Sequence, residues 1–212
     1  MRDDIFKITV DDHGFVDRII FGKLTHPVID FLHSYGFIPN HLTTLSFIFQ
    51  LWSLHYLNCG YIHLFSINYF IGYYFDCIDG PMARKYHMVT NFGDWYDHIT
   101  DIFCYLLANY LFIKKYNFLD YPFLITIDVC MIIGLVGYAG CQERIYNKGL
   151  SDNKKSKSLY LTTIFIKNEE NTIKNEENTI KNEENIIKSL VPFCYTNYVL
   201  YICSLPFLLS YF

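Results

Sequence analysis

Four aspartates in residues 76–101 are the side chains best suited to chemistry, spaced as Asp76-x2-Asp79 and Asp97-x3-Asp101. These i, i+3 and i, i+4 spacings place each pair on one face of a helix. Burying like charges together is costly, so four gathered carboxylates need a compensating cation. Hard oxygen ligands without clustered Cys or His favour Mg²⁺, with Mn²⁺ or Ca²⁺ as alternatives, over Zn²⁺. Because protein-bound Mg²⁺ usually completes its shell with water and substrate phosphate, the pattern predicts a phosphate-bearing substrate.

The flanking sequence indicates that these acids lie on two membrane helices. Residues 61–75 before the first pair and 102–113 after the second are apolar, with few exceptions. The link over residues 85–91 is short, so we expect antiparallel neighbours. At a rise of about 1.5 Å per residue, Asp76 and Asp101 lie roughly 12 to 13 Å from the linked helix ends. The four acids are therefore predicted to meet at one depth.

Composition defines the fold class. The chain has 212 residues, of which 52% are hydrophobic and 19% aromatic, with several apolar runs near the length of a membrane span. The prediction is an all-α integral membrane protein: a polytopic bundle of five or six transmembrane helices with an N-terminal interfacial amphipathic helix. A net charge of -4 offers no basic field, so no nucleic-acid partner is expected.

The chain divides into four predicted parts. Residues 1–37 form the interfacial segment, whose helix Pro27 should kink or split. Residues 38–145 form a catalytic membrane core of four spans, the first over 42–59 and the fourth over 121–142. Residues 146–188 form a basic cytosolic loop followed by three near-copies of IKNEENT, a solvated low-complexity repeat. Residues 189–212 form the last span, and residues 159–166 are too few to cross alone, which leaves five or six spans open.

The spacing of residues 76–101, D-x2-D-G-x2-A-R-x8-G-x3-D-x3-D, resembles the signature of the CDP-alcohol phosphotransferases. These membrane enzymes make phospholipids by displacing CMP from a CDP-linked group. Residues 39–43, Pro-Asn-His-Leu-Thr, resemble the P-N-x-x-T that precedes the first span in that family. The resemblance covers about residues 36 to 145. A cation-conducting or merely structural acid cluster is the alternative reading of the aspartates.

The resemblance implies a site with two Mg²⁺ ions, with Mn²⁺ as an alternative. Asp76 and Asp97 are expected to bridge both ions, Asp79 to bind the first, and Asp101 to bind the second and act as the general base. The residues expected to line the CDP moiety are Asn40, Thr43, Gly80, Ala83, Arg84, Thr90 and Gly93. Basic residues in the positions where relatives hold a phosphorylated acceptor are Arg144, Lys148, Lys154, Lys155 and Lys157, although membrane topology alone also explains them.

The implied reaction is an in-line attack of an alcohol oxygen on the phosphorus distal to cytidine. The compact length resembles the phosphatidyltransferases, which pass a phosphatidyl group from CDP-diacylglycerol to inositol, glycerol 3-phosphate or serine. His98, directly after Asp97, resembles instead the choline and ethanolamine branch, which uses a soluble CDP-alcohol and diacylglycerol. Two further alternatives are an aspartate-rich intramembrane prenyltransferase and an inactive homologue that serves as a membrane scaffold. Because members of this family are commonly homodimers, the resemblance also predicts a homodimer.

Loop charges predict the orientation. Eleven Lys and Arg residues flank the spans on one side, against Lys114 and Lys115 on the other. By the positive-inside rule, the richer side and the acids face the cytosol. The host membrane would be the endoplasmic reticulum in a eukaryote or in host expression, and the plasma membrane in a bacterium. A spacing of three residues between Gly134, Gly137 and Gly140 offers a close helix contact, within the chain or between copies.

Overall fold

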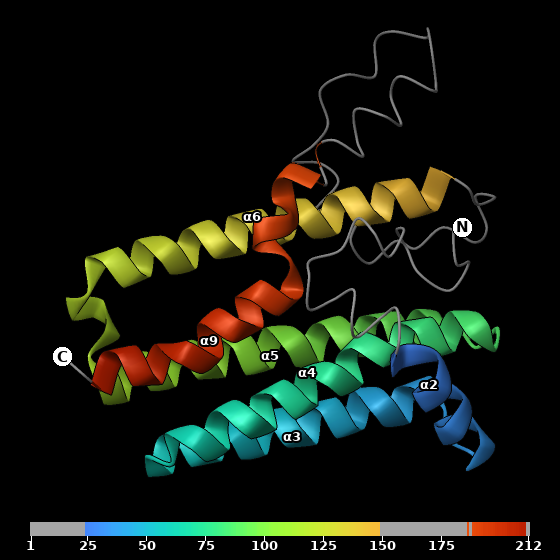
Figure 1. Cartoon of the computed structure of the whole chain (residues 1–212), viewed down its shortest axis with the longest axis horizontal. Coiled ribbons are helices and arrows are strands. Elements are labelled where there is room, and N and C mark those ends of the chain that lie inside the picture. The colour runs from blue at the N-terminus through green and yellow to red at the C-terminus, as the bar shows by residue number, and fades with distance from the viewer. Residues whose placement is uncertain (1–23, 149–185, 187, 211–212) are drawn as a thin grey trace, which may run out of the picture.

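A computed structural model describes residues 24–148, 186 and 188–210 (Figure 1), and that part of the chain contains helices and no strand. The elements in chain order are α2 (Thr25–Ser34), α3 (Pro39–Cys59), α4 (Ile62–Lys85), α5 (Asn91–Tyr116), the 3-10 turn η3 (Phe118–Asp120), α6 (Pro122–Lys148), the 3-10 turn η5 (Val191–Phe193) and α9 (Tyr195–Ser210). The all-helical prediction is confirmed for these residues.

Local signals in the sequence set the helix ends. Pro39 opens α3, where its missing N–H group costs nothing and its fixed φ suits the first turn. Gly60 ends the same helix with a φ of 90°, a left-handed conformation that favours glycine. Thr90 caps α5, because its side chain accepts a hydrogen bond of 3.0 Å from the backbone N–H of Gly93. Pro81 lies inside α4, which continues to Lys85; the bend expected there stays a prediction.

Three long helices, α3, α4 and α5, lie side by side (Figure 1). As expected, α4 and α5 run antiparallel, but each packs more extensively against α3 than against the other. At Gly72 an added Cβ would lie 2.9 Å from Cγ of Gln50 and 3.0 Å from the carbonyl oxygen of Ser46. The close approach of α3 and α4 therefore requires glycine at this position, and α3 acts as a common support for the two acid-bearing helices.

Helix α9 closes the bundle by packing against α4, α5 and α6. The hydroxyls of Tyr73 and Thr196 are hydrogen-bonded at 2.5 Å, and Tyr201 donates to the Leu124 carbonyl at 3.0 Å. Ser66 donates to the carbonyl oxygen of Cys203 at 2.8 Å. Hydrogen bonds of polar side chains thus hold α9 against α4 and α6 at several positions along the helix.

Helix α2 is tied to the end of α4. The Asp30 carboxylate accepts hydrogen bonds from Lys85 and from the Tyr86 hydroxyl, and the ring of His33 stacks on that of Tyr86 with centroids 3.5 Å apart. The bond from Lys85, followed by that from Tyr86, lowers the pKa of Asp30 below its usual 3.8. Pro27 lies in the first turn of α2. The rest of the predicted interfacial helix falls at residues 1–23, outside the described residues.

Only part of the predicted membrane topology can be read from hydropathy. Within the described residues one helix, α6, is long and apolar enough to cross a membrane, over Pro122–Glu143 with a mean hydropathy of 2.0. Helix α9 is apolar but shorter, with 16 residues. Helices α3, α4 and α5 have 21, 24 and 26 residues, enough to span, but their polar side chains lower their hydropathy. The count of five or six spans is therefore not confirmed.

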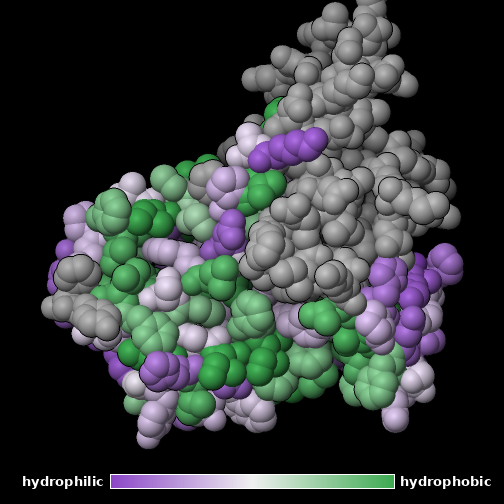
Figure 2. All heavy atoms as spheres, in the orientation of Figure 1, coloured by the Kyte–Doolittle hydropathy of each residue, from purple (hydrophilic) through white to green (hydrophobic). Residues whose placement is uncertain are grey.

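The outer surface of the bundle is nevertheless largely apolar. Figure 2 shows hydrophobic side chains over much of one face, with hydrophilic ones gathered at the end that carries α2. Large apolar side chains are exposed on each of the four long helices, including Trp52, Ile67, Leu106 and Ile133. At Gly137 of α6 an added Cβ would lie 3.5 Å from Leu190, an ordinary van der Waals contact, so packing within the described chain does not require glycine there. The predicted fifth span and the repeat lie outside the described residues.

Candidate active site

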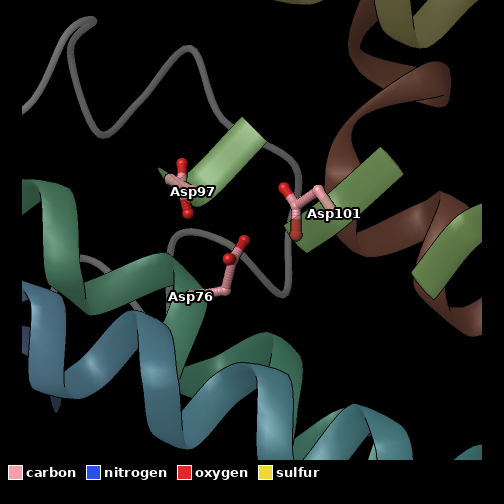
Figure 3. Close-up of side chains that lie close together, drawn as sticks. All are labelled: Asp76, Asp97 and Asp101. Carbon is pink, nitrogen blue, oxygen red and sulfur yellow. The ribbon is translucent and has the colours of Figure 1, made fainter. Parts of the chain in front are cut away.

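The acids of α4 and α5 form a cluster between these two helices. Carboxylate oxygens of Asp76, Asp97 and Asp101 all lie within 4.8 Å of one another. Figure 3 shows the three carboxylates pointing into one space, Asp76 from α4 and the other two from successive turns of α5. All three side chains are half-buried. We predicted that the acids of the two helices meet at one depth, and this is confirmed for these three.

The contacts of Asp97 fit a cation. Its Oδ1 atom is buried and has no hydrogen-bond partner within the described part of the chain. Its Oδ2 atom lies 3.4 Å from Nδ1 of His98, and its side chain interacts with Asp76. A buried carboxylate oxygen that faces other carboxylates is unfavourable unless a positive charge lies between them. The oxygen-only donor set is the kind that Mg²⁺ and Mn²⁺ prefer.

Asp79 lies apart from the three mutually close carboxylates, and its role as a ligand of the first ion stays a prediction. It is 7% exposed and lies outside the group of mutually close oxygens. Its Oδ2 atom accepts a hydrogen bond of 2.5 Å from the Thr43 hydroxyl on α3. The reason is geometric, because residues three apart on a helix differ by about 60° in direction, and α3 lies on the Asp79 side. The structure therefore links Asp79 to Thr43, a residue expected at the CDP moiety.

Asn40, Thr90 and Gly93 meet at the start of α5. A Cβ added to Gly93 would lie 2.8 Å from Oδ1 of Asn40 and 3.1 Å from Oγ1 of Thr90. Thr90 is the N-cap of α5 and accepts from the backbone of Gly93. Thr90 thus has a structural role beside the predicted binding role, and the signal for it was a threonine directly before the helix. Gly93 is required for the close approach of α3 and α5.

Gly80, Ala83 and Arg84 lie on the last turns of α4. A Cβ added to Gly80 would lie 3.2 Å from Nη1 of Arg84, so the guanidinium lies back over the glycine. The carbonyl of Ala83 accepts from the backbone N–H of Met88 at 2.8 Å, which helps to end the helix. The predicted nucleotide-binding residues therefore occupy the end of α4 and the starts of α3 and α5, on one side of the acid cluster.

A cavity of about 340 Å³ adjoins the acid cluster, and sequence reasoning missed it. Its residues come from the four long helices and α9: Gln50, Tyr69, Tyr73, Asp76, His98, Asp101, Ile102, Tyr105, Ile132, Leu135, Val136, Ala139, Tyr198 and Val199. Gln50 is buried and donates to the Ser46 hydroxyl at 3.0 Å. It lies two helical turns after Thr43, on the same face of α3, and this spacing was the available signal.

The predicted acceptor residues are not placed by the structure. Arg144 and Lys148 lie in the last turns of α6, but their side chains are outside the described part. Lys154, Lys155 and Lys157 lie outside the described residues altogether. Their role in acceptor binding stays a prediction.

Comparison with known proteins agrees with the acid cluster. The family model for the CDP-alcohol phosphatidyltransferases matches residues 36–166, which include α3, α4, α5 and α6, and the chain belongs to this family. The resemblance predicted from the spacing is confirmed. Proteins of this family are phosphotransferases of phospholipid synthesis that use a CDP-alcohol donor and an alcohol acceptor, and they generally depend on a divalent metal. No curated protein and no solved structure matches the chain.

Proposed function

We propose that this chain is an integral membrane enzyme that transfers a substituted phosphate from a CDP-linked donor to the hydroxyl of an alcohol, with release of CMP. The observation that carries this proposal is the convergence of Asp76, Asp97 and Asp101 within 4.8 Å, inside a chain whose family performs phosphotransfer. An acid cluster of this density fits a divalent cation and the diphosphate that it would bind.

The aspartates would have two roles in the reaction, proton transfer and metal binding. Asp101 lines the cavity, and its carboxylate can take the proton of a hydroxyl that attacks from there. As the new bond from the acceptor oxygen to phosphorus forms, the bond from that phosphorus to the bridging oxygen breaks, and the electron pair leaves with CMP. The three clustered carboxylates and Asp79 would hold Mg²⁺, in two ions by family analogy, and the bound metal would neutralise charge on the diphosphate.

The nucleotide would lie at the opposite side of the acids from the cavity. Arg84, folded over Gly80, offers a planar fork for a phosphate, and Gly93 lets Asn40 lie directly against the start of α5. The Thr43 hydroxyl fixes the orientation of Asp79. These residues come from three different helices, so their arrangement depends on the packing of α4 and α5 on α3.

We also propose the membrane arrangement. Five or six spans, the acids open to the cytosol, and α2 in the interface fit the exposed apolar side chains along α3 to α6 and the distribution of Lys and Arg. The host membrane would be the endoplasmic reticulum in a eukaryote or in host expression, and the plasma membrane in a bacterium. A homodimer remains part of the proposal, with the face of Gly134, Gly137 and Gly140 as one candidate for the contact.

The identity of the acceptor separates two finer functions. The sequence favoured phosphatidyl transfer from CDP-diacylglycerol to a soluble alcohol such as inositol, glycerol 3-phosphate or serine. The apolar cavity beside Asp101 favours the second candidate, transfer from a soluble CDP-alcohol to a lipid alcohol.

A CMP-release assay tests the proposed function. The purified full chain in detergent is incubated with Mg²⁺, a CDP-linked donor and an alcohol, using CDP-diacylglycerol with soluble alcohols and CDP-choline or CDP-ethanolamine with diacylglycerol. We expect CMP release that requires both an alcohol and Mg²⁺ and that Asp101→Asn abolishes. If no pairing releases CMP from a folded protein, the inactive homologue is the correct reading.

A further inference from the structure

One face of α3 carries four buried polar side chains along its length. Thr43, Ser46, Gln50 and Ser53 recur at spacings of three and four residues, so they share one side of the helix, and each is at most 8% exposed. These four residues form the polar face of α3. Thr43 donates to Asp79 of α4, and α3 packs against both α4 and α5. The helix that supports the two acid-bearing helices therefore also presents hydrogen-bonding groups to them.

Gln50 is the member of the polar face that reaches the acid cluster. Its side chain lines the cavity and is hydrogen-bonded to the carboxylate of Asp101 on α5. Because an ionised carboxylate can only accept, the amide of Gln50 is the donor in this bond. The Nε2 atom of Gln50 also donates to the Ser46 hydroxyl at 3.0 Å. One amide group thus connects the base expected from the sequence to the polar face of α3.

Packing holds the Gln50 side chain in place. At Gly72 of α4 an added Cβ would lie 2.9 Å from Cγ of Gln50 and 3.2 Å from its backbone nitrogen, so the α4 backbone lies directly against the glutamine. The bond to Ser46 holds the amide from the side of α3. A side chain that is fixed by both packing and a hydrogen bond can orient the group that it contacts. For Gln50 that group is the Asp101 carboxylate.

Asp101 is the acid whose orientation the proposed chemistry constrains most. Under the proposed function its carboxylate both binds a cation and takes a proton from the attacking hydroxyl, and the two roles use lone pairs that point in different directions. The terminal torsion of an aspartate has broad minima, so the plane of a free carboxylate turns easily. A hydrogen bond from a fixed donor restricts this rotation. The contact from Gln50 would therefore keep both directions of the carboxylate available at once.

We infer that Gln50 is a positioning residue for the proposed phosphotransfer, because its amide holds Asp101 in the orientation that metal binding and proton transfer require. Gln50 itself takes no proton and binds no metal. Thr43 makes the corresponding contact with Asp79, so α3 would orient one acid from each of the two acid-bearing helices. The inference rests on the proposed function and adds to it a residue that the aspartate signature does not contain.

Gln50→Met is the first test, because it keeps the length of the side chain and removes the amide donor. With a donor and an alcohol that give CMP release in the assay above, kcat should fall about ten- to a hundredfold, the usual cost of losing a group that orients a metal ligand. The KM for the CDP-linked donor should stay within about twofold of wild type, because the lost contact is to Asp101 and not to the nucleotide residues. A rise in that KM with an unchanged kcat would overturn the inference.

Two serines of the polar face give a matched pair of variants. Ser46 accepts from Gln50, whereas Ser53 donates to the carbonyl oxygen of Phe65 at 2.8 Å, and neither serine is among the described residues that line the cavity. Both are buried, so Ser46→Ala and Ser53→Ala should change the Tm by similar amounts. Only Ser46→Ala releases the Gln50 amide, so it should lower kcat, by a smaller factor than Gln50→Met, while Ser53→Ala leaves kcat unchanged. Equal kcat values for the two alanine variants would contradict the role of the amide.

The affinity for Mg²⁺ gives a readout that does not depend on turnover. Thermal unfolding of the purified full chain in detergent is followed as MgCl2 is added to metal-free protein. The Mg²⁺ concentration that gives half of the stabilisation should rise about tenfold or more in Gln50→Met. It should not change in Ser53→Ala.

The two readouts separate failure of this inference from failure of the proposed function. If Gln50→Met lowers only the Tm and keeps the wild-type kcat and Mg²⁺ midpoint, Gln50 merely packs α3 against α4 and the inference is wrong. If the wild type releases CMP with no donor and alcohol, the proposed function fails, and the Mg²⁺ titration alone still decides whether Gln50 orients Asp101.

Discussion

Removing one carboxylate from the acid cluster should have opposite effects with and without metal. Two unit charges 4.8 Å apart repel by roughly 3.5 kcal/mol at an effective dielectric constant of about 20. Asp97→Asn removes two of the three pairwise repulsions while keeping the shape of the side chain. Solvent and proton uptake relieve part of this repulsion, so the sum is an upper bound. The metal-free variant should therefore be at least as stable as the metal-free wild type.

Bound metal should reverse this order of stability, so that the wild type becomes more stable than Asp97→Asn. At a concentration a hundredfold above its Kd, Mg²⁺ stabilises a single-site protein by about 2.7 kcal/mol. For a chain of this size that corresponds to a rise in Tm of roughly 5 to 10 °C. Asp97→Asn loses a ligand and should show less than a third of this rise.

The assay is thermal unfolding of the purified chain in detergent, followed by tryptophan fluorescence in EDTA and in MgCl2. Asp120→Asn is the matched control, because it removes an exposed carboxylate from the turn after α5, far from the cluster. It should keep the full response to Mg²⁺. The reasoning is refuted if Mg²⁺ stabilises Asp97→Asn as much as the wild type, or if Mg²⁺ leaves the wild type unchanged.

Three further predictions concern the parts that position the site. Thr90→Ala removes the N-cap of α5 and should lower the free energy of unfolding by about 1 kcal/mol, measured in denaturant, whereas Thr90→Ser should restore it. Gly72→Ala forces a methyl group to within 2.9 Å of Gln50 on α3 and should cost about 1 to 3 kcal/mol by the same measurement; a neutral result would contradict the close packing. The lowered pKa of Asp30 means that its bonds to the end of α4 stabilise the fold above pH 3.8 and are lost as the pH falls through the lowered value. The Tm advantage of wild type over Asp30→Asn should therefore be present at pH 6 and should shrink progressively as the pH falls below 3.8.

The sequence was sufficient to predict the helices and the acid cluster. The spacing of the aspartates defined helix faces, and Pro39 marked the start of α3. Spacing could not give the rotation of each helix about its axis, because this depends on what it packs against. Asp79 therefore lies against Thr43 on α3, outside the cluster that Asp76 forms with α5.

The cavity could not be predicted for a related reason. Its walls combine residues from five helices, and the contribution of α9 depends on a long-range contact such as that between Tyr73 and Thr196. No local pattern in the sequence records such a contact. Asp128 was visible as an isolated acid in an apolar run, but its neighbours Tyr105 and Tyr198 become apparent only in the folded bundle.

The position of α9 in the chain has a consequence for biosynthesis. The helices that carry Asp76 and Asp101 leave the ribosome well before α9, which supplies Tyr198 and Val199 to the cavity. A nascent chain that has completed α5 already contains the three acids of the cluster. It still lacks the wall of the cavity that α9 supplies. That wall is completed only when α9 packs against α4, α5 and α6.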